Sequence, residues 1–152
     1  MGRPEGQGCY CAVNNLMRMI IDRASKKYEW VVVDNEAGME HLSRRTTRDV
    51  DILLVVTDPT VRGVVAAKGI TELARDLSIN VERSYLIVNR LASTLTPALQ
   101  SAIDEIDIEL AGTIPYDPLM AEFDSYGRPL VEATIDSAAY RAVQEIVDKV
   151  TR

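Results

Sequence analysis

Polar side chains follow the apolar runs of this sequence at the points where strands are expected to end. Asp34 directly follows the Trp-Val-Val-Val run at residues 30–33, and Asn89 and Arg90 follow the apolar run at residues 85–88. A carboxylate at the carboxyl end of a buried parallel strand lies where open α/β sheets bind ligands, and it suits the hydration shell of a nucleotide-bound Mg²⁺. For an isolated run of this kind, a buried strand closed by a helix N-cap is the commoner explanation.

Cys9 and Cys11 are the only cysteines, and a single tyrosine separates them. Because one intervening residue strains an intramolecular disulfide, the pair indicates metal ligands or a redox pair in a reducing compartment. Zinc, copper(I) and thiolate-bound nickel suit two thiolates. His41 is the one other soft candidate ligand in the chain, and the same pair from two copies around a twofold axis would give four sulfurs. Two unligated thiols in a loop remain the alternative.

The elements that must position these residues alternate along the chain. Apolar runs predict strands at residues 30–34, 51–57, 85–90 and 110–115, the last near an edge; periodic or polar stretches predict helices at residues 12–27, 39–48, 61–77, 97–106 and 135–150. Thr60 is the expected N-cap of the third helix. Connections this long exclude hairpins and favour βαβ crossovers, so we expect one α/β domain over residues 1–152, with a mostly parallel sheet flanked by helices. Parallel strands gather their carboxyl ends at one edge, which predicts a single crevice there.

Composition narrows the function classes. The formal net charge of −6 and the lack of a Lys/Arg cluster disfavour a nucleic-acid partner. Trp30 and Phe123 are the only residues of their kinds, so an aromatic platform for nucleic-acid bases is not expected. No apolar run approaches the roughly 20 residues of a membrane span, and no signal-peptide pattern opens the chain. We therefore expect a cytoplasmic protein with no membrane partner.

Several segments, in this order and spacing, resemble the deviant P-loop ATPases of the MinD/ParA/ArsA group. The segments are Asp34-Asn35-Glu36-Ala37-Gly38, Thr57-Asp58-Pro59-Thr60, Asn89-Arg90 and Ile114-Pro115-Tyr116-Asp117. Within that group the chain is similar to the CooC type, the accessory ATPases that assist nickel insertion into carbon monoxide dehydrogenase. That likeness is carried by the Gly-rich approach to Cys9-Tyr10-Cys11 and by residues 34–45.

The resemblance implies ATP or ADP with Mg²⁺ as cofactor and a P-loop NTPase-like fold. Asp34 would hold a Mg²⁺-bound water at the end of the Walker B strand, and the Gly38 backbone would face the γ-phosphate. The adenine-side contacts would come from Asn89, Arg90, Pro115 and Tyr116. Taken singly, capping or turn roles explain Asp34, Asn89 and Pro115 at least as well.

The sequence also departs from the group, because it contains no G-x-x-x-x-G-K-[ST] phosphate loop. We therefore expect the C-terminal part of such an ATPase domain, and we expect this chain alone neither to hydrolyse ATP nor to bind it tightly. In the group the phosphate-loop strand lies between the strands expected here at residues 30–34 and 52–57. Without it each strand would expose an edge, unless the two pair directly, a partner chain fills the gap, or the chain belongs to a longer product.

The function that the resemblance implies is a nucleotide-switched, homodimeric metallochaperone ATPase, or a fragment of one, which delivers nickel to carbon monoxide dehydrogenase through a Ni or Zn site at Cys9 and Cys11. The alternatives are a non-catalytic metal- or protein-binding module that retains the α/β shell, and a fragment of another MinD/ParA-like ATPase.

Overall fold

A computed structural model describes residues 16, 19–21, 23–35, 49–132 and 137–152. The chain falls into two compact units, and each is described by itself. The first contains Met1–Asp51 and Ile70–Glu82, and the second contains Ile52–Gly69 and Arg83–Arg152. The helix expected at residues 39–48 lies outside the described residues, and the expectation of one domain stays a prediction.

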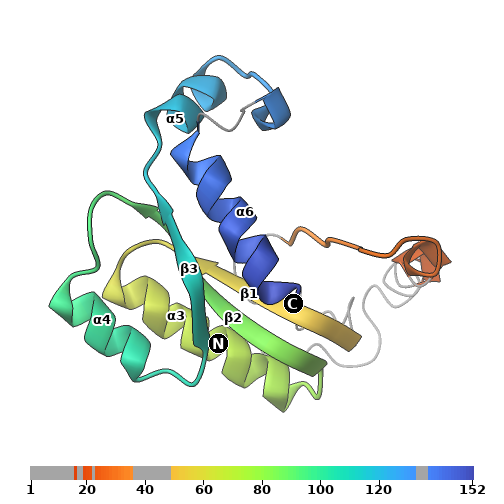
Figure 1. The fold of residues 1–152 in the computed structure, drawn as a ribbon. Coiled ribbons are helices and arrows are strands. Elements are labelled where there is room, and N and C mark those ends of the chain that lie inside the picture. The colour runs from red at the N-terminus through yellow and green to blue at the C-terminus, as the bar shows by residue number, and fades with distance from the viewer. Residues whose placement is uncertain (1–15, 17–18, 22, 36–48, 133–136) are drawn as a thin grey trace. The chain divides into compact units, whose positions relative to one another are not determined.

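The described elements confirm the α/β fold class (Figure 1). In chain order they are β1 (Asp49–Thr57), α3 (Val61–Asp76), β2 (Asn80–Leu91), α4 (Pro97–Asp104), β3 (Glu109–Pro115), α5 (Pro118–Ser125), the 3₁₀ helix η1 (Leu130–Glu132) and α6 (Ala138–Val150). The strands form a three-stranded sheet in the order β1-β2-β3, and β2 and β3 run parallel. The expected strand at residues 110–115 is β3, and it lies at an edge of this sheet.

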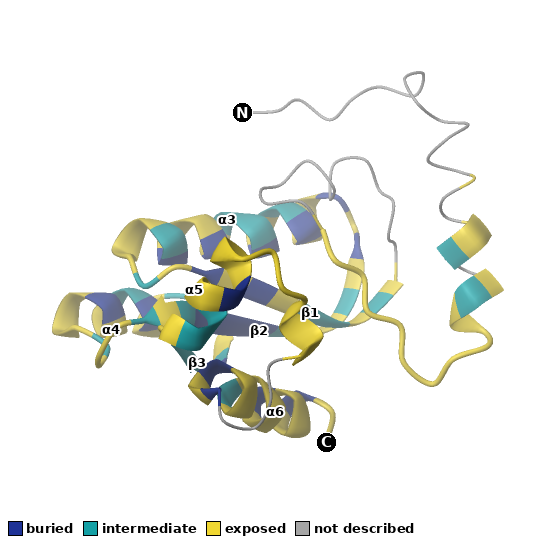
Figure 2. Cartoon of the chain, turned by 90° about the horizontal axis from the view of Figure 1, so that it is seen from above, coloured by how far each residue is buried: buried dark blue, intermediate teal, exposed yellow. Residues whose placement is uncertain are grey.

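The central strand β2 is the most buried part of the second unit. Every residue from Tyr85 to Val88 is buried, as expected for a parallel strand covered on both faces. Successive side chains point to opposite faces, so Leu86 and Val88 face away from Tyr85 and Ile87. Figures 1 and 2 show α4 on one face of the strands and α6 on the other. Both faces of β2 are therefore covered by helices.

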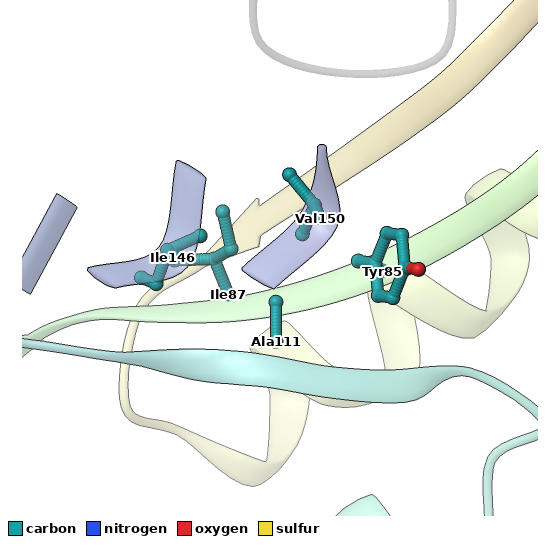
Figure 3. Packing of buried hydrophobic residues seen from close by; sticks show 5 residues of the cluster. All are labelled: Tyr85, Ile87, Ala111, Ile146 and Val150. Carbon is teal, nitrogen blue, oxygen red and sulfur yellow. The ribbon is translucent and has the colours of Figure 1, made fainter. Parts of the chain in front are cut away.

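Helix α6 packs on β2 and β3 through a small apolar cluster (Figure 3). The cluster consists of Tyr85, Ile87, Ala111, Ile146 and Val150. Gly112 allows the close approach, because a Cβ there would lie 2.8 Å from Ile146 Cγ1. Lys149 Nζ adds a hydrogen bond to the Leu110 carbonyl at 2.9 Å and an ion pair with Glu109 at 2.9 Å. The C-terminal half of α6 is thus fixed on the edge strand.

The first unit contains a second, smaller core. Ala74, Leu77 and Ile79 are buried there, with Val50 and Val81 packed against them. Of the described residues of the helix expected at 12–27, residues 16, 19–21 and 23–25 are helical, and residues 26 and 27 form a turn. Three apolar residues of that helix, Leu16, Met19 and Ile20, are exposed, whereas Ile21 and Ala24 are half-buried.

The strand expected at residues 30–34 is wrong for this structure. Residues 30–35 have no regular secondary structure, and Trp30 and Val32 are 58% and 93% exposed. A strand exists only when a neighbour accepts and donates its backbone hydrogen bonds, and the described sheet contains β1, β2 and β3 but not this segment. The run is apolar enough for a buried strand, but the neighbour that would make it a strand is not among the described elements.

Candidate functional site

The end of β1 forms a tight connection to α3. As expected, Thr60 caps the helix: its Oγ1 accepts the Gly63 N–H at 3.0 Å, and it donates to Asp58 Oδ1 at 2.6 Å. Gly63 is required here, since a Cβ would fall inside contact distance of Thr57 Oγ1 and Asp58 Oδ1. This turn places the Asp58 carboxylate at the carboxyl end of the sheet.

The end of β2 is a β-bulge that contains two of the four residues expected on the adenine side, Asn89 and Arg90. Val88 pairs with Thr113 and Leu91 pairs with Pro115, so two residues of β2, Asn89 and Arg90, face one residue of β3. Arg90 has a φ of 55°, in the left-handed region that a residue with a Cβ rarely adopts. Asn89 Oδ1 accepts the Arg90 N–H at 2.8 Å, which stabilises this backbone. Bulges of this kind redirect side chains next to binding sites.

The end of β3 lies directly beside that bulge. The Tyr116 N–H donates to the Leu91 carbonyl at 2.9 Å, which joins the two strands one residue past the bulge. The Tyr116 side chain is 54% exposed, and the Arg90 side chain is exposed as well. The structure therefore brings four of the predicted site residues together: Asn89, Arg90, Pro115 and Tyr116.

Asp117 is the residue of this region whose role the sequence analysis missed. Its Oδ1 accepts the Leu119 N–H at 2.9 Å and caps α5; its Oδ2 accepts the Ser137 hydroxyl at 2.7 Å and the Ala139 N–H at 3.1 Å. The Ser137 hydrogen bond, followed by that from Ala139, outweighs the cost of burial and holds the pKa of Asp117 below its usual range. Asp-Pro at residues 117–118 is the signal that would have predicted α5, with a cap and a proline at the first helical position.

The other predicted site residues belong to the first unit or lie outside the described residues. Asp34 belongs to the first unit, where it is exposed on irregular chain. Gly38, Cys9, Cys11 and His41 lie outside the described residues. Within the part of the chain that the structure describes, no group of three or more His, Cys, Asp or Glu side chains is arranged to hold a metal ion. No helix described in the structure is long and apolar enough to cross a membrane.

Comparisons with known proteins point to one group. No family model matches the chain. An uncharacterized ATP-binding protein of Methanocaldococcus jannaschii is 43% identical over 150 residues, which are 99% of this chain and 59% of that protein. The carbon monoxide dehydrogenase accessory protein CooC of Rhodospirillum rubrum is 36% identical over 124 residues, or 80% of this chain and 46% of that protein.

Solved structures agree on the fold. The MinD cell division protein of Aquifex aeolicus superposes with a TM-score of 0.73 at 20% identity, covering 91% of this chain and 60% of that one. The septum site-determining protein MinD of Pyrococcus horikoshii, solved with Mg-ADP, gives a TM-score of 0.70 at 20% identity, covering 90% of this chain and 56% of that one. The fold is therefore MinD-like, and the homologues are ATP-binding proteins. The chain spans a little over half the length of the first relatives that it matches.

Proposed function

We propose that the carboxyl ends of β2 and β3 form the adenine-binding half of a MinD/ParA-type nucleotide site. The observation that carries this proposal is the bulge at Asn89 and Arg90, which the Tyr116 N–H joins to the end of β3. Strand ends of a parallel sheet are where α/β folds bind nucleotides. A left-handed arginine is an unfavourable backbone state, and such states concentrate at binding sites.

The chemistry of these residues suits adenine, whose amino group lies beside a ring nitrogen that accepts a hydrogen bond. A side-chain amide can accept from the adenine amino group and donate to a ring nitrogen, whereas guanine reverses the donor and acceptor at its corresponding edge. Asn89 Oδ1 keeps a second lone pair after it accepts the Arg90 N–H. The exposed Tyr116 ring and Arg90 guanidinium supply planar groups for stacking on the base.

The test is a titration of the isotope-labelled chain with adenosine, a ligand that needs no phosphate-binding loop. We expect saturable chemical-shift changes at the amides of Asn89, Arg90 and Tyr116, and weaker or no changes with guanosine at the same concentrations. Asn89→Ala should abolish the preference for adenosine. Equal responses to both nucleosides, or no response at the strand ends, would overturn the proposal.

We also propose that in the whole protein this half-site belongs to an ATPase, with Asp34 holding a Mg²⁺-bound water and the Gly38 backbone facing the γ-phosphate. The support is the 43% identity to an ATP-binding protein and the MinD-like fold. Because the sequence has no phosphate loop, MgATP should bind this chain no more tightly than adenosine does. Isothermal titration calorimetry measures this directly, and micromolar MgATP affinity would contradict it.

The finer proposal is a CooC-like role: a cytoplasmic, homodimeric nickel chaperone whose client is carbon monoxide dehydrogenase. It is supported by the 36% identity to CooC over 80% of the chain and by the Cys9-Tyr10-Cys11 sequence. Two thiolates suit Zn or Ni but leave a tetrahedral site half filled, so the cysteines of two copies would share one ion. We expect about one metal ion per two chains by plasma emission, and none in the Cys9→Ser/Cys11→Ser variant. Equal metal content in the two proteins would exclude the site.

A further inference from the structure

We infer that Asp117 and Ser137 form a positioning pair that fixes the strand ends at which the base is proposed to bind. Neither residue is assigned a contact with the base. The inference builds on the proposed adenine site, and it concerns how the polypeptide holds that site in shape.

The Asp117 carboxylate is fully engaged by the protein itself. One oxygen caps α5 through the Leu119 N–H, and the other accepts from Ser137 and from the backbone of α6 at Ala139. These three donors come from two helices and meet one side chain directly after Tyr116. A carboxylate with both oxygens engaged in this way is suited to holding backbone in place, not to reading a base.

Ser137 completes the connection from the α6 side. Its side chain is 1% exposed, and its hydroxyl both donates to Asp117 and accepts the Tyr140 N–H at 3.0 Å, so it caps α6. Asp117 and Ser137 are 20 positions apart, and α5 and η1 lie between them in the sequence. Their hydrogen bond therefore joins the two ends of that segment. Buried polar groups that satisfy one another in this manner rigidify the backbone around them.

The two ends of α6 are therefore attached by different means, one to β3 and the other to the residue that links β3 to α5. The C-terminal half packs through Ile146 and Val150 and through Lys149, while the N-terminal end is attached at Asp117. Tyr116 lies between the last β3 residue and this attachment, and its N–H reaches across to Leu91. Loss of the Asp117 hydrogen bonds leaves the Tyr116 backbone unsupported on its C-terminal side. The bulge at Arg90 then no longer lies beside a rigid strand end.

The experiment compares three variants of the full chain. Asp117→Asn keeps an oxygen for Leu119 but replaces the Ala139 acceptor by a donor, and Ser137→Ala removes the hydroxyl. Thr96→Ala is the matched control, because it deletes a helix N-cap of the same type on α4, where Thr96 Oγ1 accepts the Leu99 N–H at 3.2 Å. Two quantities are measured: amide exchange of Tyr116 relative to Val88, which cancels global stability, and the adenosine Kd.

We expect Asp117→Asn and Ser137→Ala each to raise the relative exchange rate of Tyr116 about tenfold and to weaken adenosine binding about tenfold, or about 1.4 kcal/mol. Thr96→Ala should change neither quantity. An unchanged Tyr116 exchange rate in both variants overturns the inference whether or not adenosine binds. Faster exchange with unchanged adenosine affinity overturns it too, and leaves the proposed function standing. Failure of the wild type to bind adenosine overturns the proposed function, while the exchange measurement still decides whether the pair holds Tyr116.

Discussion

Two apolar runs of this chain, at residues 30–33 and 85–88, have similar composition and opposite structures. The second is the centre of β2, buried on both faces between helices and hydrogen-bonded to two neighbouring strands. The first has no regular structure and exposes Val32 almost completely. An apolar run of this kind thus suits a buried strand, but it becomes a strand only when neighbouring strands share its backbone hydrogen bonds.

The same contrast separates the polar residues that follow the two runs. Asn89 is held by the Arg90 N–H within a bulge, beside a third strand end that is itself fixed by Asp117. Asp34 follows chain with no strand neighbour among the described residues, and it is exposed. A binding residue needs a rigid strand end behind it. This difference supports the proposal that the described half of the site lies on β2 and β3.

The largest difference between the two runs should appear on truncation of their side chains. Leu86 is fully buried, so Leu86→Ala should destabilise the chain by about 2–5 kcal/mol through lost transfer energy and a cavity. Val32→Ala should change stability by less than about 0.5 kcal/mol, as exposed substitutions do. Urea unfolding followed by circular dichroism gives both values. If Val32→Ala lowered the free energy of unfolding as much as Leu86→Ala, the first run would be buried in solution like the second.

A smaller loss of stability is expected from a substitution where β1 meets α3. Gly63→Ala pushes a methyl group against Thr57 and Asp58, both fixed by the turn, and overpacking of this kind costs about 1–3 kcal/mol. The midpoint and slope of a urea titration measure the loss. A neutral result would mean that the end of β1 adapts as readily as an exposed segment, and the strand ends would then not be rigid.

The sequence predicted most of the second unit because its signals are local. The strands at residues 51–57, 85–90 and 110–115 became β1, β2 and β3, and the expected cap at Thr60 is present. The register shift that forms the bulge could not be predicted, since it depends on pairing between β2 and β3 across sequence distance. The link from Asp117 to Ser137 was equally hidden, because it joins residues 20 positions apart across two helices.

The Asp117 link should also be detectable from its dependence on pH. The hydrogen bonds of Asp117 lower its pKa in the folded protein. They therefore stabilise the fold fully above the unfolded-state pKa of about 4, and this stabilisation is lost as the pH falls through the folded-state pKa. At neutral pH, Asp117→Asn should cost about 1–2 kcal/mol, and this gap to the wild type should shrink on acidification below pH of about 4. Urea titrations at neutral pH and below pH of about 4 measure the difference in unfolding free energy between the variant and the wild type. Asp124→Asn, on the exposed side of α5, controls for the loss of one negative charge. A gap that stayed constant with pH would show that the carboxylate charge is not what binds the two helices.

The smallest expected effect has the opposite sign. Gly69 lies in the same helix as Gly63, but among the described residues nothing lies within 4 Å of a Cβ placed there. Gly69→Ala should stabilise the chain by about 0.5–1 kcal/mol, because alanine loses less backbone entropy than glycine in a helix interior. Thermal and urea unfolding measured side by side with Gly63→Ala test this on one element. If both substitutions destabilised the chain equally, helix α3 as a whole would resist added methyl groups, and the tight fit assigned to the end of β1 would lose its support.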